Sequence, residues 1–220
     1  MRVCPVVNKY TVFITWSCFE SRIVNIFFVN TDPNAAAWAM VDRHVVKMIL
    51  ETAQILSTAH RVLDGKEQTV KSKSGRNKKA YVLSDSREAI LYSATHVNHP
   101  STVWARQTSA NYDWLLDHFY ELAREYTYRY GKIHATVQKL GTSLNRLPKN
   151  IPAAKVITTI PSCMAPEFIV SNDPVTNYRN YYNKGKTNLH RWTRRLPPNW
   201  IEGEIVQDAN KPIYTIKRKN

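Results

Sequence analysis

One long stretch, residues 33–63, constrains the fold more than any other part of the chain. Its apolar residues recur with helical spacing, at Trp38, Val41, Val45, Met48, Ile49, Ile55, Leu56, Ala59 and Val62. Asp32 can cap the first turn, Pro33 fits the first helical position, and Gly65 supplies a stop. We predict a single helix about 45 Å long, at 1.5 Å per residue, against which the rest of the chain packs.

A second long helix is predicted over residues 101–130, which carry a regular apolar face and end at Gly131. Shorter helices are predicted over 84–95 and 132–145, and the alternating residues 10–29 indicate one or two short strands or an extended arm. The predicted fold class is therefore mainly α. We expect a single compact domain, 1–220, built on two long antiparallel helices, with a short N-terminal extended arm (1–31) and an irregular, basic C-terminal segment (177–220).

The charge of the chain indicates its partner. Lysine and arginine number 31 against 17 acidic residues, a formal net charge of +14. Such an excess favours a polyanion, either nucleic acid or an anionic membrane surface. Nucleic acid is the better candidate because no apolar run approaches the ~20 residues of a spanning helix. The first residues lack a secretory pattern, and the scattered cysteines fit a reducing cytoplasm, that of the host if a phage encodes the chain.

Residues 66–80 form a small, strongly basic segment that we predict to be a mobile loop. Its composition fits either a solubilising surface loop or an arm that becomes ordered on DNA and contacts phosphates. Under the second interpretation the residues that bind DNA are Lys73, Arg76, Lys78 and Lys79.

The C-terminal part of the chain interleaves aromatic and basic residues. Aromatic rings stack on bases while cations hold phosphates, a combination suited to single-stranded or distorted nucleic acid. Alternatively, the rings close the core and the cations face solvent. Because the basic window contains no acid, we favour nucleic acid. The residues predicted to bind DNA are Tyr178, Arg179, Tyr181, Tyr182, Lys184, Lys186, Arg191, Trp192, Arg194 and Arg195.

The run DRHVVKMILE places His44, Lys47 and Glu51 along one edge of the apolar stripe of the first helix. A half-buried edge allows pKa values to shift while a substrate still reaches the side chains. A purely structural interpretation makes Lys47 and Glu51 an ion pair worth a few tenths of a kcal/mol. The functional interpretation makes Glu51 a catalytic acid/base assisted by His44 and Lys47, with Arg43 beside them on DNA. Phosphate-loop, dinucleotide and nucleophile-elbow motifs are absent from the sequence, as is a metal-ligand pattern, so we predict no cofactor and no metal.

The run VDRHVVKMILET resembles the first helix of the pyrimidine-dimer DNA glycosylases of T-even phages, the endonuclease V family. In that family an Asp-x-His is followed, seven residues after the His, by the catalytic Glu, and Asp42, His44 and Glu51 match this order and spacing. HPSTVWARQTSANYDWLLDHFYELAREY is similar to the central helix of the family. NYRNYYNKGK, at 177–186, is similar to its Tyr- and Lys-rich segment, which contacts DNA at the lesion.

The resemblance implies a compact all-α protein that flips or kinks DNA and attacks the sugar C1′ carbon. There an amine forms a Schiff base while the Glu, here Glu51, handles protons. The amine of the family is the α-amino group of a Thr just before the helix, exposed by removal of the initiator Met. Asn30 and Thr31 occupy the nearest place here without a free amine. Lys47, or a water activated by Glu51, can replace that amine as the nucleophile.

We therefore predict a DNA glycosylase, with or without AP-lyase activity. It would act as a monomer on a duplex with a distorted, damaged or modified base. Two alternatives stay open from the sequence: a non-catalytic DNA-binding protein, and a transferase that modifies bases in phage DNA.

Overall fold

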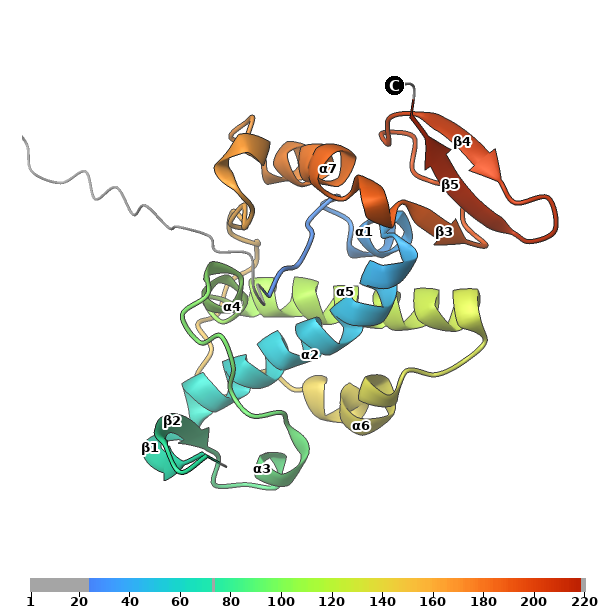
Figure 1. Ribbon diagram of the computed structural model, residues 1–220. Coiled ribbons are helices and arrows are strands. Elements are labelled where there is room, and N and C mark those ends of the chain that lie inside the picture. The colour runs from blue at the N-terminus through green and yellow to red at the C-terminus, as the bar shows by residue number, and fades with distance from the viewer. Residues whose placement is uncertain (1–23, 73, 219–220) are drawn as a thin grey trace, which may run out of the picture.

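The computed structural model describes residues 24–72 and 74–218, with the elements arranged as in Figure 1. Its α-helices are α1 (Pro33–Ala39), α2 (Asp42–Asp64), α3 (Arg87–Ile90), α4 (Pro100–Ala105), α5 (Ser109–Tyr130), α6 (Ala135–Leu144) and α7 (Pro174–Gly185). Short 3-10 turns form η1 (Pro166–Phe168) and η2 (Thr187–Leu189). The strands are β1 (Lys66–Lys71), β2 (Asn77–Val82), β3 (Arg191–Thr193), β4 (Glu204–Gln207) and β5 (Ile213–Lys217).

The predicted fold class, mainly α on two long helices, is wrong. The described ranges contain seven α-helices and two antiparallel sheets, β1–β2 and β3–β5–β4, so the class is mixed α/β. Both segments predicted to be irregular contain strands. Residues 66–80 belong to a hairpin, in which Lys66 pairs with Val82 and Lys71 with Asn77. The C-terminal segment contains α7 and the three-stranded sheet.

The helix predicted over 33–63 is two helices, because residues 40 and 41 are extended, with ψ of 140° and 155°. Side chains from distant parts of the chain donate hydrogen bonds to carbonyls that would accept from backbone N–H groups in a continuous helix. Trp192 Nε1 donates to the Ala39 carbonyl at 3.0 Å, and Arg129 donates to that of Trp38 at 3.2 Å. These bonds satisfy both carbonyls outside the helix ladder, so the chain can turn before α2 begins.

Two other predicted helices are shorter in the structure. Residues 101–130 divide into α4 and α5, where Thr108 caps α5 by accepting from the N–H of Asn111. Residues 84–95 form only α3. The guanidinium of Arg61 donates to the carbonyls of Glu88, Leu91 and Tyr92, which makes them unavailable to a longer helix.

Several predicted helix ends are confirmed. Asp32 accepts from the N–H groups of Asn34 and Ala35, Gly65 caps α2, and Gly131 ends α5 in the left-handed conformation. The helix predicted over 132–145 is α6. Within the described residues, every helix is too short or too polar to cross a membrane.

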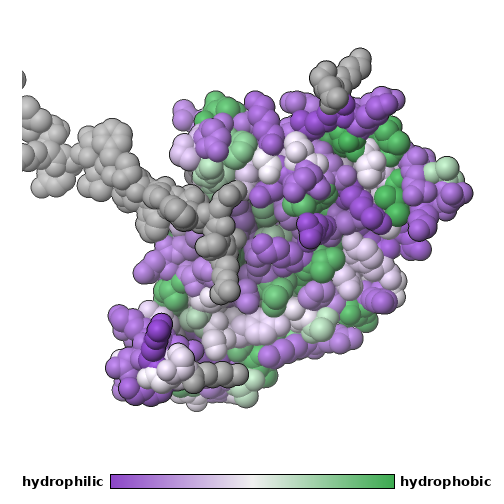
Figure 2. Space-filling model, viewed as in Figure 1, coloured by the Kyte–Doolittle hydropathy of each residue, from purple (hydrophilic) through white to green (hydrophobic). Residues whose placement is uncertain are grey.

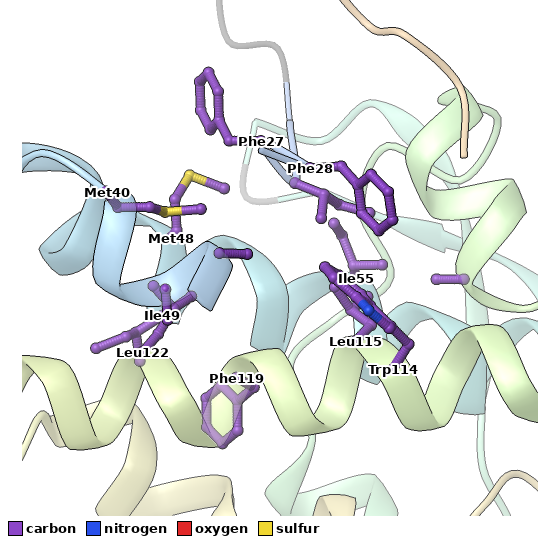
Figure 3. Packing of buried hydrophobic residues seen from close by; sticks show 14 of the residues in the cluster. Phe27, Phe28, Met40, Met48, Ile49, Ile55, Trp114, Leu115, Phe119 and Leu122 are labelled. Carbon is purple, nitrogen blue, oxygen red and sulfur yellow. The ribbon is translucent and has the colours of Figure 1, made fainter. Parts of the chain in front are cut away.

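The core lies where α2 crosses α5 in the opposite direction (Figure 1). In Figure 3 Ile49 of α2 lies beside Leu122 of α5, and Ile55 lies beside Leu115; Phe119 of α5 belongs to the same cluster. All five side chains are at most 1% exposed, so this contact is fully dehydrated.

The segment before α1 completes the core. Residues 24–31, the described part of the predicted N-terminal arm, form no strand and lie against the helices instead. Val24, Ile26, Phe27, Phe28 and Val29 are all buried, and the ring of Phe28 lies tilted against that of Trp114, with centroids 4.7 Å apart (Figure 3). The strands predicted within 10–23 lie outside the described residues. Residues 24–31 are therefore not a strand, and burial of five apolar side chains holds this segment against the helices.

A buried charge network joins the first residue of α2 to the C-terminal sheet. Asp42 accepts from Arg129 at 3.0 Å and from the Thr193 N–H and hydroxyl at 2.9 and 2.8 Å. Arg129, whose side chain is fully buried, also bonds Glu125 at 2.7 Å. Asp42 thus ties α2, α5 and β3 together at one point.

We expect Asp42→Ala to lower the free energy of unfolding by about 3–5 kcal/mol, because it leaves a buried cation short of its partner. Urea unfolding followed by circular dichroism measures the change. Asp113→Ala, on the exposed side of α5, is the matched control and should stay within about 0.5 kcal/mol of wild type. Equal losses for the two variants would contradict the role given to Asp42.

Candidate functional site

A pocket of about 990 Å³ opens beside the N-terminal half of α2. Its walls come from the segment before α1, the first turns of α2, the loop around residues 163–168 and the end of α7. Five residues predicted from the sequence to act in catalysis or DNA binding line it together: Arg43, His44, Lys47, Tyr181 and Lys186. The pocket therefore joins the predicted catalytic helix to the predicted nucleic-acid segment.

Glu51 lies behind this lining, one turn along α2 from Lys47. Its side chain is 12% exposed, and Oε1 lies 2.9 Å from Lys47 Nζ. Oε2 accepts from the backbone N–H of Asn25 at 3.4 Å. Because Lys47 and Asn25 both line the pocket, the carboxylate stands at its wall, largely shielded from bulk water.

Asn25 and Phe27 are site residues that the sequence analysis did not identify. The Asn25 side-chain oxygen accepts from the N–H groups of Ile26 and Phe27, and its amide donates to the Cys163 carbonyl at 2.7 Å. This turn holds Phe27 at φ 54°, a conformation that aromatic residues rarely adopt. Strain of this kind persists only where surrounding contacts over-determine it, and it gathers at functional sites.

Phe27 connects the two sides of the pocket through its ring. The ring stacks on His44 at a centroid distance of 4.1 Å and lies 6.1 Å from Tyr181. Tyr181 in turn packs on Phe168, with the ammonium of Lys186 4.6 Å from its ring centre. The pocket thus presents aromatic surface beside cations.

His44 is held neutral. Burial, followed in decreasing order by the positive charges of Lys186, Lys47 and Arg43, lowers its pKa to about 3. Its Nδ1 lies 2.5 Å from the hydroxyl of Tyr182, whose own pKa is raised by burial. A neutral imidazole keeps one N–H donor and one acceptor nitrogen, and the Tyr182 hydroxyl can form this bond with Nδ1 in either role. His44 can therefore donate a hydrogen bond but does not serve as a general acid at neutral pH.

This neutral state makes the fold sensitive to acid. In the unfolded chain a histidine takes up a proton near pH 6.5, whereas folded His44 does so only near pH 3. Between these values the unfolded state binds more protons, so stability falls as the pH falls, by up to about 1.4 kcal/mol per pH unit for each such group. His60 and His118, with pKa values lowered by burial to about 4, add to the same slope.

We expect His44→Gln to flatten the pH dependence of the unfolding free energy between pH 4.5 and 6.5 by about 1 kcal/mol per unit. Urea titrations at four pH values measure this slope. His96→Asn, which replaces an exposed histidine, should leave it unchanged. The role given to His44 is wrong if the unfolding free energies of the two variants change with pH by the same slope.

Three of the aromatic residues predicted to bind DNA are fully buried: Tyr178, Tyr182 and Trp192. The Tyr178 hydroxyl donates to the Pro161 carbonyl at 3.0 Å, and the Trp192 indole donates to Ala39. None of these rings has an exposed face to stack on a base. Tyr181 is the predicted aromatic residue that reaches the pocket.

The predicted arginines of the C-terminal part lie away from the pocket lining and mostly bind the protein itself. Arg195 pairs with Glu125 at 2.9 Å and lies between the rings of Trp38 and Tyr128. Arg179 donates to the Val29 carbonyl, and Arg194 to that of Tyr128. Arg191, 57% exposed at its side chain, lies 3.4 Å from Asp42. Lys184 is exposed on α7.

The third predicted group lies on the β1–β2 hairpin, at the other end of α2. Arg76 and Lys78 are exposed there, and Lys79 pairs with Glu67 at 2.8 Å. Lys73 lies outside the described residues. These cations are not brought to the pocket, because the length of α2 separates the two places (Figure 1).

The three residues that carry the resemblance to phage glycosylases take different places. His44 lines the pocket, Glu51 stands at its wall, and Asp42 is engaged in the buried charge network. Membership of that family stays a prediction. Comparison of the chain with protein-family models, with curated proteins and with solved structures finds no match in any of the three.

Proposed function

We propose that this protein is a DNA glycosylase that acts on a damaged or modified base, with Glu51 as the group that handles protons. The observation that carries the proposal is the position of Glu51. It is a carboxylate only 12% exposed, held between Lys47 and Asn25 at the wall of a cation-lined pocket. A shielded carboxylate of this kind can accept a proton from an attacking nucleophile and return it to a leaving base.

The pocket suits a nucleotide in size and chemistry. Its volume of about 990 Å³ lies at the upper end of the usual range for small-molecule sites. Phe27, Phe168 and Tyr181 offer ring surface to an extruded base. Arg43 and Lys186 also line the pocket, and in this proposal they hold the flanking phosphates.

The reaction breaks the bond between C1′ and the base nitrogen. A nucleophile forms a new bond to C1′ and gives up a proton to Glu51, while the base leaves with the bonding electrons and takes a proton. With water as the nucleophile, the products are the free base and an abasic sugar. With an amine, opening of the sugar ring gives an imine at C1′, from which elimination of the 3′ phosphate follows.

Water is the nucleophile that the 220-residue chain favours. The Lys47 ammonium donates to Glu51 and has no free electron pair in that arrangement. The nitrogen of Asn25 is a peptide nitrogen, whose electron pair is delocalised into the carbonyl. A water beside Glu51 needs neither nitrogen, so we propose base release without a covalent intermediate for the full chain.

A panel of duplexes tests the proposal. Each carries one lesion or modification: a pyrimidine dimer, an oxidised or alkylated purine, a deaminated cytosine, or a bulky substituted pyrimidine. We expect one class to release free base, detected by chromatography, and to leave an alkali-labile abasic site. Salt-sensitive binding of every duplex without base release from any would overturn the proposal in favour of a non-catalytic DNA-binding protein.

A further inference from the structure

The β1–β2 hairpin carries cations that the pocket does not use. Lys66, Lys71, Arg76 and Lys78 are exposed, whereas the acid Glu67 is already paired with Lys79. In Figure 2 the hairpin stands out as a mainly hydrophilic lobe at the lower left of the molecule. Its charge is therefore positive and available to a partner.

The cations lie on both faces of the ribbon and at its turn. Lys66 and Lys78 pair with Val82 and Val70 on one face, and Lys71 pairs with Asn77 on the other. Arg76 lies at the turn beside Gly75. A groove of nucleic acid has phosphates along both walls, and the major groove of B-DNA, about 12 Å wide, admits a two-stranded ribbon. The major groove of double-stranded RNA is too narrow for such an element.

The root of the hairpin is firmly held. Arg61 of α2, 5% exposed, donates to the carbonyl of Tyr81 at 3.0 Å and to the Glu88 carboxylate at 2.6 Å. The same carboxylate accepts from the N–H of Leu83, directly after β2, at 2.7 Å. Tyr81, near the end of β2, is thus bonded directly to α2, and Leu83 is bonded to Glu88, which itself pairs with α2. These bonds hold the hairpin in place relative to that helix.

α2 sets the separation between the hairpin and the pocket. From Lys47 to Asp64 the helix rises about 26 Å, at 1.5 Å per residue. That length corresponds to about eight base pairs of duplex at 3.4 Å each. The strands of the hairpin add up to about 20 Å beyond the helix end. Figure 1 shows the hairpin and α7, which contributes to the pocket, on opposite sides of the molecule.

We infer that the hairpin is a second DNA contact, which binds the duplex about eight to thirteen base pairs to one side of the nucleotide in the pocket. The inference rests on the proposed function, since it assumes that the pocket holds the target nucleotide. It adds a fixed spacing and a direction: the protein covers the duplex asymmetrically, and it needs one long arm of DNA.

Duplexes with one tetrahydrofuran abasic site test this spacing by fluorescence anisotropy. One arm is held at 20 base pairs while the other is cut from 16 to 12, 8 and 4, and each arm is shortened in turn. We expect affinity to fall at least tenfold when one particular arm becomes shorter than about eight base pairs. Shortening the opposite arm to the same length should change affinity much less.

A variant that lacks the hairpin cations shows whether the hairpin causes this step, the abrupt loss of affinity when one arm is shortened. We expect the combined substitutions Lys66→Ser, Lys71→Ser, Arg76→Ser and Lys78→Ser to abolish the length dependence and to lower the salt slope by about three to four. The matched control removes four exposed cations elsewhere, Lys132, Arg146, Lys155 and Lys211, and should keep the step. Thermal melting verifies that both variants are folded, and the pair Lys71→Ser and Arg76→Ser at the tip should halve the effect.

Three results would overturn the inference: a step that survives in the hairpin variant, a step that the control variant also loses, or equal weakening at every arm length. The last would mark the hairpin as a general polyanion surface. These measurements use an unreactive duplex and record binding alone. A length step without base release in the lesion panel would therefore defeat the proposed function and leave the hairpin contact standing.

Discussion

Glu51→Gln is expected to reduce base release by about 10²–10⁴-fold, the usual contribution of a general acid–base group. Glutamine keeps the shape of the side chain and can still accept from the N–H of Asn25, which now lies 3.4 Å from the carboxylate. It cannot take a proton from water or return one to the base. Single-turnover release of free base from the preferred duplex measures the loss.

The same variant should bind DNA almost as tightly as wild type, because Arg43, Lys47 and Lys186 remain in the pocket. Glu204→Gln, an exposed position on β4, is the control and should leave both rate and affinity unchanged. Wild-type turnover by Glu51→Gln would remove the carboxylate from the chemistry. A large loss of affinity with unchanged turnover would make Glu51 a binding residue.

A chain that begins at Asn25 is expected to form a covalent adduct with DNA that borohydride traps. In such a chain the nitrogen at the Glu51 carboxylate is a primary amine in place of a peptide nitrogen. The amine is positioned beside a proton acceptor and next to the pocket, the arrangement that activates an N-terminal nucleophile. A fusion cleaved immediately before Asn25 supplies the protein, and gel electrophoresis after reduction detects the adduct.

The control for this experiment adds one residue. A chain with glycine in front of Asn25 has the same core and an amine displaced by one residue, about 3.8 Å along the chain. We expect the adduct with Asn25 first, and at least tenfold less with the added glycine or after the Glu51→Gln change. Equal trapping of the 220-residue chain would assign the amine to a lysine, and Lys47 is the first lysine to replace by arginine.

The sequence predicted the local features of this fold well. The caps at Asp32 and Gly65 and the end at Gly131 depend on residues within one helical turn, so they can be recognised without the rest of the chain. The break at residues 40 and 41 depends on Trp192 and Arg129, far along the chain. The periodicity of 33–63 carries no information about these distant partners, so the sequence predicts a continuous helix across residues 40 and 41.

The candidate site divides in the same way. His44, Lys47 and Glu51 share one edge of a helix, and their spacing alone placed them together. Asn25 and Phe27 reach the same pocket from an apolar run whose pattern predicts a strand. The pattern does not predict the turn that they form, because contacts with distant residues, Cys163 and His44, hold it. The basic segment 66–80 was predicted as a loop from its charge, although strand pairing decides its conformation.

The tie between Asp42 and Thr193 has a consequence for how the protein matures on the ribosome. Asp42 begins the helix that carries His44 and Glu51, yet two of its hydrogen bonds come from a residue near the end of the chain. A nascent chain that has emerged only as far as η2 holds every residue that lines the pocket but not this tether. Assembly of the site should thus wait until β3 has left the exit tunnel, so that shorter nascent chains lack a fixed α2.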